Sequence, residues 1–80
     1  MKKFEIQTKA NAVAQSLWEW YDPTKHENHP FSELDIDSID IIEFIIEIEK
    51  EFKVIIQDEE VERMRQMSDV INYLEEHFNQ

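Results

Sequence analysis

The sequence predicts an all-α protein: a four-helix bundle of three longer helices and one short helix, with a long first loop. Three stretches repeat apolar residues at the i, i+3, i+4, i+7 spacing that gives a helix one apolar face. The one β-favouring run, at residues 53–57, has no second strand with which to pair. The 80 residues suit one small core, so we expect a single domain over residues 1–80.

Acidic residues dominate the composition. Asp and Glu number 19 against 8 Lys and Arg, which gives a net charge of -11. This charge argues against binding to nucleic-acid phosphates and favours a partner with a basic surface. The absence of cysteine excludes disulfides and zinc–thiolate sites. We see no signal peptide and no apolar run of about 20 residues, so we expect a cytoplasmic monomer without a membrane span.

The first helix is predicted over residues 4–21, where Asp22 precedes Pro23 and ends it. Its apolar face holds Ile6, Ala10, Val13, Ala14 and Leu17, with Trp20 or Tyr21 completing it. Trp18 and Trp20 cannot both face one core, so one of them should be partly exposed. Residues 24–36 read as a loop, anchored by Phe31 and Leu34. The His26–His29 cluster has the spacing of no common metal site, so solvated histidines are the better interpretation.

The second helix begins near Asp37 or Ser38, either of which can cap it, and ends at Phe52. It carries two apolar stripes. The predicted core face comprises Ile41, Phe44, Ile45, Ile48 and Phe52, and the other stripe comprises Ile39, Ile42 and Ile46. Such a helix is either buried on both sides or exposes one stripe to a partner.

The rest of the chain predicts a connector and two helices. Residues 53–57 should place one or two isoleucines in the core. Asp58 should cap a short helix at about residues 59–65, with Val61 and Met64 facing inward. Ser68 should cap the last helix, at about residues 69–78. Its apolar stripe comprises Val70, Ile71, Leu74 and Phe78.

Four features together resemble the acyl carrier proteins, over about residues 31–78. They are the tripeptide Asp37-Ser38-Ile39, the acidic helix that it opens, the acidic segment at residues 57–62 and the final helix. The resemblance implies a carrier rather than an enzyme. A phosphopantetheinyl transferase would attach 4′-phosphopantetheine, taken from coenzyme A, to Ser38, which Asp37 and Ile39 flank. The arm would carry acyl thioesters for fatty-acid or related acyl-chain biosynthesis.

The resemblance also implies two sets of binding residues. Acyl-transferring, condensing or dehydrating enzymes with basic docking patches would meet Asp37, Ile39, Asp40, Glu43, Ile46, Glu49, Glu59, Glu60 and Glu62. An acyl chain sheltered inside the bundle would contact Phe44, Ile45, Ile48, Ile56, Val61 and Ile71. For each residue of the second set, ordinary core packing is the alternative interpretation.

The sequence argues against two other functions, a serine enzyme and a calcium-binding loop, and leaves a third open. A catalytic serine needs a neighbouring base, and nothing in the sequence directs a histidine to Ser38. A calcium loop starting at Asp35 fails, because its sixth and twelfth positions hold Asp40 and Ile46 rather than Gly and Glu. No metal site is therefore expected. An acidic interaction module that binds a basic partner and is never modified remains the alternative to a carrier.

The chain departs from the usual family pattern at three positions. Asp35 stands where the family usually has glycine, Ile39 replaces leucine, and Gln57 stands where proline is common. Among non-glycine residues, Asp is one of the few that tolerate a positive φ, if the backbone at residue 35 needs one. These departures suggest a specialised carrier rather than a housekeeping one.

Overall fold

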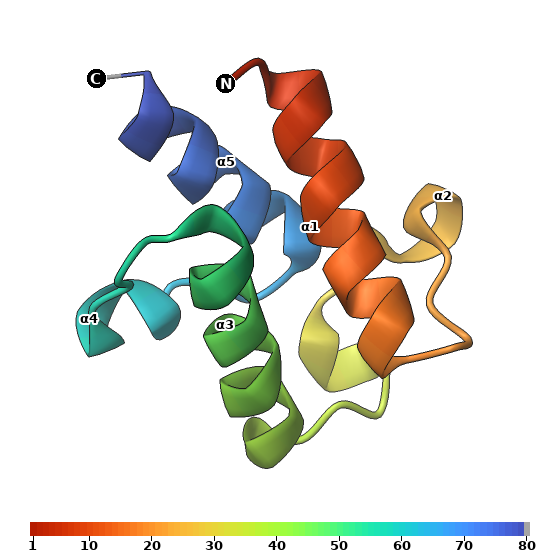
Figure 1. Ribbon diagram of the computed structural model, residues 1–80. Coiled ribbons are helices and arrows are strands. Elements are labelled where there is room, and N and C mark those ends of the chain that lie inside the picture. Colours follow the sequence, from red (N-terminus) through yellow and green to blue (C-terminus); the bar gives the residue numbers. More distant parts are fainter. Residues whose placement is uncertain (80) are drawn as a thin grey trace.

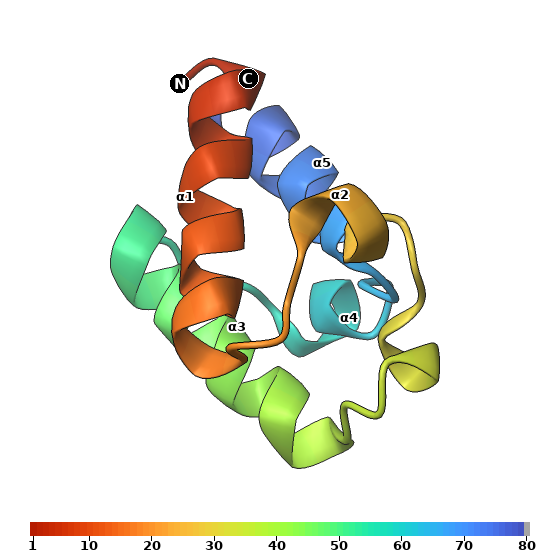
Figure 2. The same ribbon diagram turned by 90° about the vertical axis from the view of Figure 1, so that its right-hand side faces the viewer.

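Three long helices form the frame of the protein. The computed structural model describes residues 1–79, and all regular structure in this range is helical. The frame comprises α1 (Lys3–Leu17), α3 (Ser38–Phe52) and α5 (Met67–Phe78), and α1 packs against both of the others. The start of α1 and the end of α5 lie at one end of the molecule, and α3 begins at the opposite end (Figures 1 and 2). The all-α prediction is confirmed, and no helix within residues 1–79 has the length and apolar character needed to cross a bilayer.

Short helical turns occupy the connections between the long helices. The first connection contains α2 (Pro23–His26) and a 3-10 turn, η1 (Phe31–Glu33), and the second contains α4 (Asp58–Val61). The long first loop therefore includes a short helix that the sequence analysis did not predict. Its signal is local: the Asp22 carboxylate accepts from the Thr24 N–H at 3.0 Å, and Pro23 occupies the first helical position. The hydrogen bonds from Thr24 also hold the pKa of the Asp22 carboxyl below its ordinary value.

The first helix ends at Leu17, four residues before the predicted end. Trp18 leaves the helix in an extended conformation, and a turn closes where the Tyr21 N–H donates to the Trp18 carbonyl at 3.0 Å. The turn returns Tyr21 to the core, where its exposure is 3%, and leaves Trp20 48% exposed. Trp20 stacks on the half-buried Trp18 with 6.1 Å between ring centroids, and one tryptophan is therefore partly exposed, as predicted.

The last two helices also differ from their predicted bounds. Gln57, and not Asp58, is the cap residue of α4, and its carbonyl accepts the first hydrogen bonds of this helix. The helix ends at Val61 instead of continuing to residue 65. The chain then tightens, because the Met64 N–H donates to the Val61 carbonyl three residues back. Ser68 lies inside α5, which Gln66 precedes as its cap residue, and the Ser68 N–H donates to the carbonyl of Glu27. Local hydrogen bonds therefore accompany the bounds of α4, and a contact with a distant segment accompanies the start of α5.

The core lies between the three long helices and agrees with the predicted apolar faces. On α3, Ile41 is half-buried and the rest of the core face is buried, and the connector contributes Val54 and Ile56 while Ile55 points outward. Met67 is fully buried, which was not predicted. The second stripe of α3 is open to solvent, since Ile39, Ile42 and Ile46 keep 67%, 57% and 44% of their surface exposed. Of the two outcomes for a two-striped helix, the structure therefore has the exposed one.

A polar network ties α2 to α1. Both oxygens of the Glu27 carboxylate accept amide N–H groups of α1, one from Gln7 and one from Asn11, each at 3.1 Å. Asn11 is buried, and its side-chain oxygen accepts from the Tyr21 hydroxyl at 3.3 Å. Burial raises the pKa of the Tyr21 phenol well above its ordinary value, and the charges of Glu27 and Asp22 raise it further.

Lys53 ends α3 in a left-handed conformation, with φ 56° and ψ 47°, where most helices use glycine. Lys53→Gly should raise the free energy of unfolding by about 0.5–1 kcal/mol, because removing the Cβ relieves a strain of about 1–2 kcal/mol and costs some unfolded-state entropy. Urea unfolding measures the change. Lys53→Ala is the control: it removes the same charge but keeps the Cβ, and an equal gain in both variants would contradict the backbone explanation.

The buried Tyr21 should make the fold sensitive to alkali. The folded chain retains the phenol proton at pH values where the unfolded chain, which titrates near pH 10, has lost it. This contribution to stability is complete below about pH 10 and falls as the pH rises further. Tyr21→Phe should therefore flatten the alkaline loss of stability measured by urea unfolding, whereas Tyr73→Phe should leave it steep. Equal slopes in all three proteins would refute the assignment.

Candidate functional site

A reciprocal pair of hydrogen bonds fixes the start of α3. The Asp40 N–H donates to the Asp37 carboxylate at 2.9 Å, and the Asp37 N–H donates to the Asp40 carboxylate at 3.2 Å. This is a capping box in which Asp takes both positions. Of the two candidate caps, the structure therefore selects Asp37.

Ser38 is the first residue of α3, and its side chain is exposed. Because Asp37 does the capping, the Ser38 hydroxyl makes no hydrogen bond to any residue in the range 1–79. Among the described residues, no histidine lines the hollow beside it, although the carboxylates of Glu33 and Asp37 do. The Ser–His pair of a catalytic serine is therefore absent from this hollow.

Asp35 sets the direction from which the chain enters α3. Its φ is 59°, so the position that the acyl carrier resemblance assigns to glycine does need a left-handed backbone. The next residue, Ile36, turns into the core with 8% of its surface exposed. The aspartate thus keeps the conformation at some cost in strain.

A groove of about 720 Å³ runs beside Ser38. One bank consists of η1 and the start of α3, and the other consists of Met64, Arg65 and Gln66, between α4 and α5. A hydrogen bond of 2.8 Å from the Phe31 N–H to the Arg65 carbonyl joins the banks. Apolar residues line its interior: Phe31, Ile36, Ile41 and Met64.

A smaller pocket of about 190 Å³ lies between α3 and α4. Three of the six residues predicted to contact an acyl chain meet there: Ile45, Ile56 and Val61. The exposed stripe residues Ile42 and Ile46 form its outer edge. The other three predicted residues, Phe44, Ile48 and Ile71, lie in the packed core with at most 1% exposure.

The predicted docking acids fall into two groups. Asp37, Glu43, Glu59 and Glu62 are exposed, together with the apolar Ile39 and Ile46. Asp40, Glu49 and Glu60 are half-buried and already have partners. Asp40 belongs to the capping box, Glu49 accepts from the Ile56 N–H at 2.8 Å, and Glu60 lies 3.7 Å from the Arg63 guanidinium. Glu49 therefore has a structural role, holding the connector against α3, that sequence reasoning did not anticipate.

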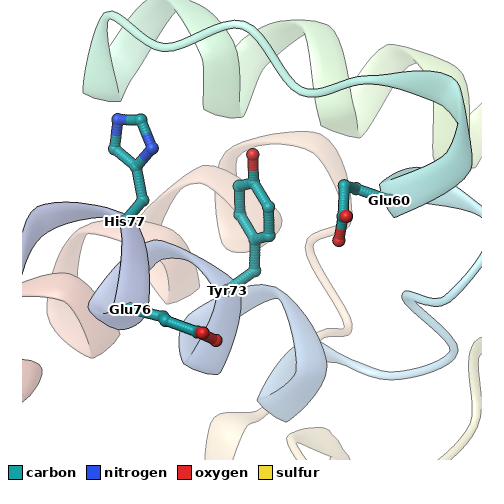
Figure 3. Close-up of a pocket in the computed structure, with 4 residues that line it drawn as sticks. All are labelled: Glu60, Tyr73, Glu76 and His77. Carbon is teal, nitrogen blue, oxygen red and sulfur yellow. The ribbon is translucent and has the colours of Figure 1, made fainter. Parts of the chain in front are cut away.

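A third hollow, of about 180 Å³, lies between α4 and α5 (Figure 3). Its lining is polar: Glu60 from α4 and Tyr73, Glu76 and His77 from α5. Nowhere in residues 1–79 do acids and histidines gather in a group that could hold a metal ion. This hollow also lacks a serine, so it offers no hydroxyl of the kind that Ser38 presents.

Replacing the cap should separate its structural role from its charge. Asp37→Ala removes the acceptor for the Asp40 N–H and should lower the free energy of unfolding by about 1 kcal/mol. Asp37→Ser also removes the charge but caps comparably well, so it should stay near the wild-type value in urea unfolding. If Ser destabilises as much as Ala, the carboxylate acts through its charge and not as a cap.

Comparison with known proteins agrees with this geometry. The family described as "Phosphopantetheine attachment site" matches residues 21–74, which include all of α3. An acyl carrier protein of Campylobacter fetus is 37% identical over 65 residues, covering 81% of this chain and 84% of that protein. One from Clostridium acetobutylicum is 40% identical over 53 residues, covering 66% and 69%.

An acyl carrier protein of Rickettsia bellii is 44% identical over 45 residues, and this match spans 56% of each chain. With some relatives, then, the alignment covers little more than half of their length. The family match and the Campylobacter alignment each cover most of this sequence. The members of the acyl carrier protein family are carriers rather than enzymes, and their cofactor is 4′-phosphopantetheine. The chain therefore belongs to this family.

Proposed function

We propose that this protein holds 4′-phosphopantetheine on Ser38 and carries acyl groups as thioesters between the enzymes of fatty-acid or related acyl-chain biosynthesis. The observation that supports this most directly is that different residues provide the cap and the free hydroxyl at the start of α3. Asp37 caps the helix, so the Ser38 hydroxyl is exposed and unused at its first residue. A serine that capped the helix would instead have its oxygen engaged by a backbone N–H before modification.

The start of α3 suits the proposed group. A helix N-terminus presents backbone N–H groups and a positive dipole end, both of which favour a phosphodiester. In the transfer, the Ser38 oxygen bonds to the phosphorus of the pantetheine phosphate. The pyrophosphate bond of coenzyme A breaks, adenosine 3′,5′-bisphosphate leaves, and the hydroxyl proton passes to a base of the transferase. Asp37 and Asp40 repel the phosphate, but a covalent bond retains it.

We also propose that partner enzymes dock on the outer face of α3 and on α4. Four exposed acids there, Asp37, Glu43, Glu59 and Glu62, have no ion-pair partner among the described residues. They flank the exposed stripe of Ile39, Ile42 and Ile46. A partner with lysines or arginines around a small apolar patch matches this pattern, and charge attraction would speed its approach. The phosphopantetheinyl transferase would be the first such partner.

For the acyl chain we propose entry at the pocket between α3 and α4. Ile45, Ile56 and Val61 already face this space, so the first part of the chain needs no rearrangement. The pocket is small, and Phe44, Ile48 and Ile71 are buried in the core and are not part of its lining. A longer chain would reach these three only by separating them, and native packing opposes this.

Intact mass tests the proposal. Wild-type protein incubated with coenzyme A and a broad-range phosphopantetheinyl transferase should gain one phosphopantetheinyl unit, and Ser38→Ala should gain none. Ser32→Ala is the matched control, because Ser32 is also exposed and lines the same groove, and this variant should be modified like the wild type. The helical circular dichroism of Ser38→Ala should be unchanged, since Asp37 supplies the cap.

A mass gain in Ser38→Ala would show that the site is misassigned. No gain in the wild type, while a control carrier is modified in the same reaction, would instead support an unmodified acidic module. In that case Ser38→Ala should bind a basic partner as tightly as the wild type does.

A further inference from the structure

Arg65 lines the same groove as Ser38. It is an exposed residue of the α4–α5 connection, whereas Ser38 is at the start of α3. The other charged residues that line the groove are Glu33 and Asp37, so Arg65 supplies its only positive charge within the described residues. In a chain of net charge -11, a cation beside the candidate attachment site calls for an explanation.

The backbone of Arg65 is held on both sides. Its carbonyl accepts from the Phe31 N–H at 2.8 Å, and its own N–H donates to the Asp69 carboxylate at 2.9 Å. These bonds fix the Cα of Arg65 beside η1 without using its side chain. Among the described residues, no carboxylate lies within ion-pair distance of the guanidinium, although Arg63, two residues earlier, pairs with Glu60 at 3.7 Å. Arg65 thus has a fixed backbone and an exposed guanidinium with no ion-pair partner among the described residues.

Resting on the proposed attachment at Ser38, we propose that this groove is the docking site of the protein's own arm, with Arg65 binding its phosphodiester. The chemical groups of the arm match the residues that line the groove. The phosphate adjoins Ser38, where Arg65 can pair with it, since guanidinium groups suit phosphate oxygens. Beyond one methylene, the arm has a carbon with two methyl groups, which match the apolar side chains of Phe31, Ile41 and Met64.

Charge favours this direction over others. Glu33 and Asp37 line the groove and repel the phosphate, whereas Arg65, in the same lining, attracts it. Arg65 therefore biases the phosphate toward the Met64–Gln66 segment, away from these two carboxylates. Because the guanidinium is exposed, its attraction is modest, and the arm exchanges between docked and free positions.

The test compares apo and holo protein by NMR, with modification confirmed by mass. In the wild type, the arm should shift the methyl signals of Ile41 and Met64 and give nuclear Overhauser effects to them. Arg65→Gln should reduce these apo-to-holo shifts roughly threefold, as expected for loss of one exposed charge pair. Arg63→Gln removes the same charge two residues away, outside the groove, and should leave the shifts unchanged.

Arg65→Lys should keep much of the effect, and high salt should weaken it in the wild type. Apo spectra of all variants should overlay away from the substituted residue, because the bonds of Arg65 to Phe31 and Asp69 use its backbone. Holo protein without shifts at Ile41 and Met64, or equal losses in the two glutamine variants, would overturn this inference alone. Absence of any mass gain would overturn it together with the proposed function.

Discussion

The hydrogen bond from the Asp40 N–H to the Asp37 carboxylate determines where α3 begins, and the arrangement of the site depends on that starting point. A start one residue later would make Ser38 the cap and occupy its hydroxyl. With Asp37 as the cap, Ser38 is free, and the helix places Ile41, Ile45 and Ile48 toward the core while the stripe that begins at Ile39 points to solvent. The cap therefore determines both that the Ser38 hydroxyl is free and which face of the helix points outward.

Because the chain lacks glycine, it holds both ends of α3 by other means. Asp35 before the helix and Lys53 after it adopt left-handed conformations that glycine would adopt without strain. Beyond the C-terminal end, Glu49 binds the Ile56 N–H with its carboxylate and the Val54 N–H with its carbonyl. These bonds compensate for backbone strain and hold the connector on the core. As a result α3 is fixed at both ends, and its outer face is exposed to solvent.

The sequence predicted the features that depend on residues close together in the chain. The spacing of isoleucines identified both stripes of α3, and the Asp-Ser-Ile tripeptide with the acidic helix identified the family. Helix ends that depend on distant partners were missed: α5 starts at Met67, where the Ser68 N–H meets Glu27, some forty residues earlier in the chain. The groove was missed for the same reason, since Phe31 and Arg65 are neighbours only in the folded protein. Only for α2 did the local sequence, Asp22-Pro23-Thr24, indicate a helix start that was not predicted.

A carrier has two opposing needs, because its arm must be kept from solvent between encounters yet surrender its cargo to each enzyme. A strong binding site would satisfy the first need and defeat the second. A single exposed guanidinium and a shallow apolar groove hold the arm with a free energy comparable to thermal energy, so a docked partner can compete for it. Of the exposed acids that would attract that partner, Glu43, Glu59 and Glu62 lie outside the groove and only Asp37 lines it. A partner could therefore bind first on the acids outside the groove and draw the arm out afterwards.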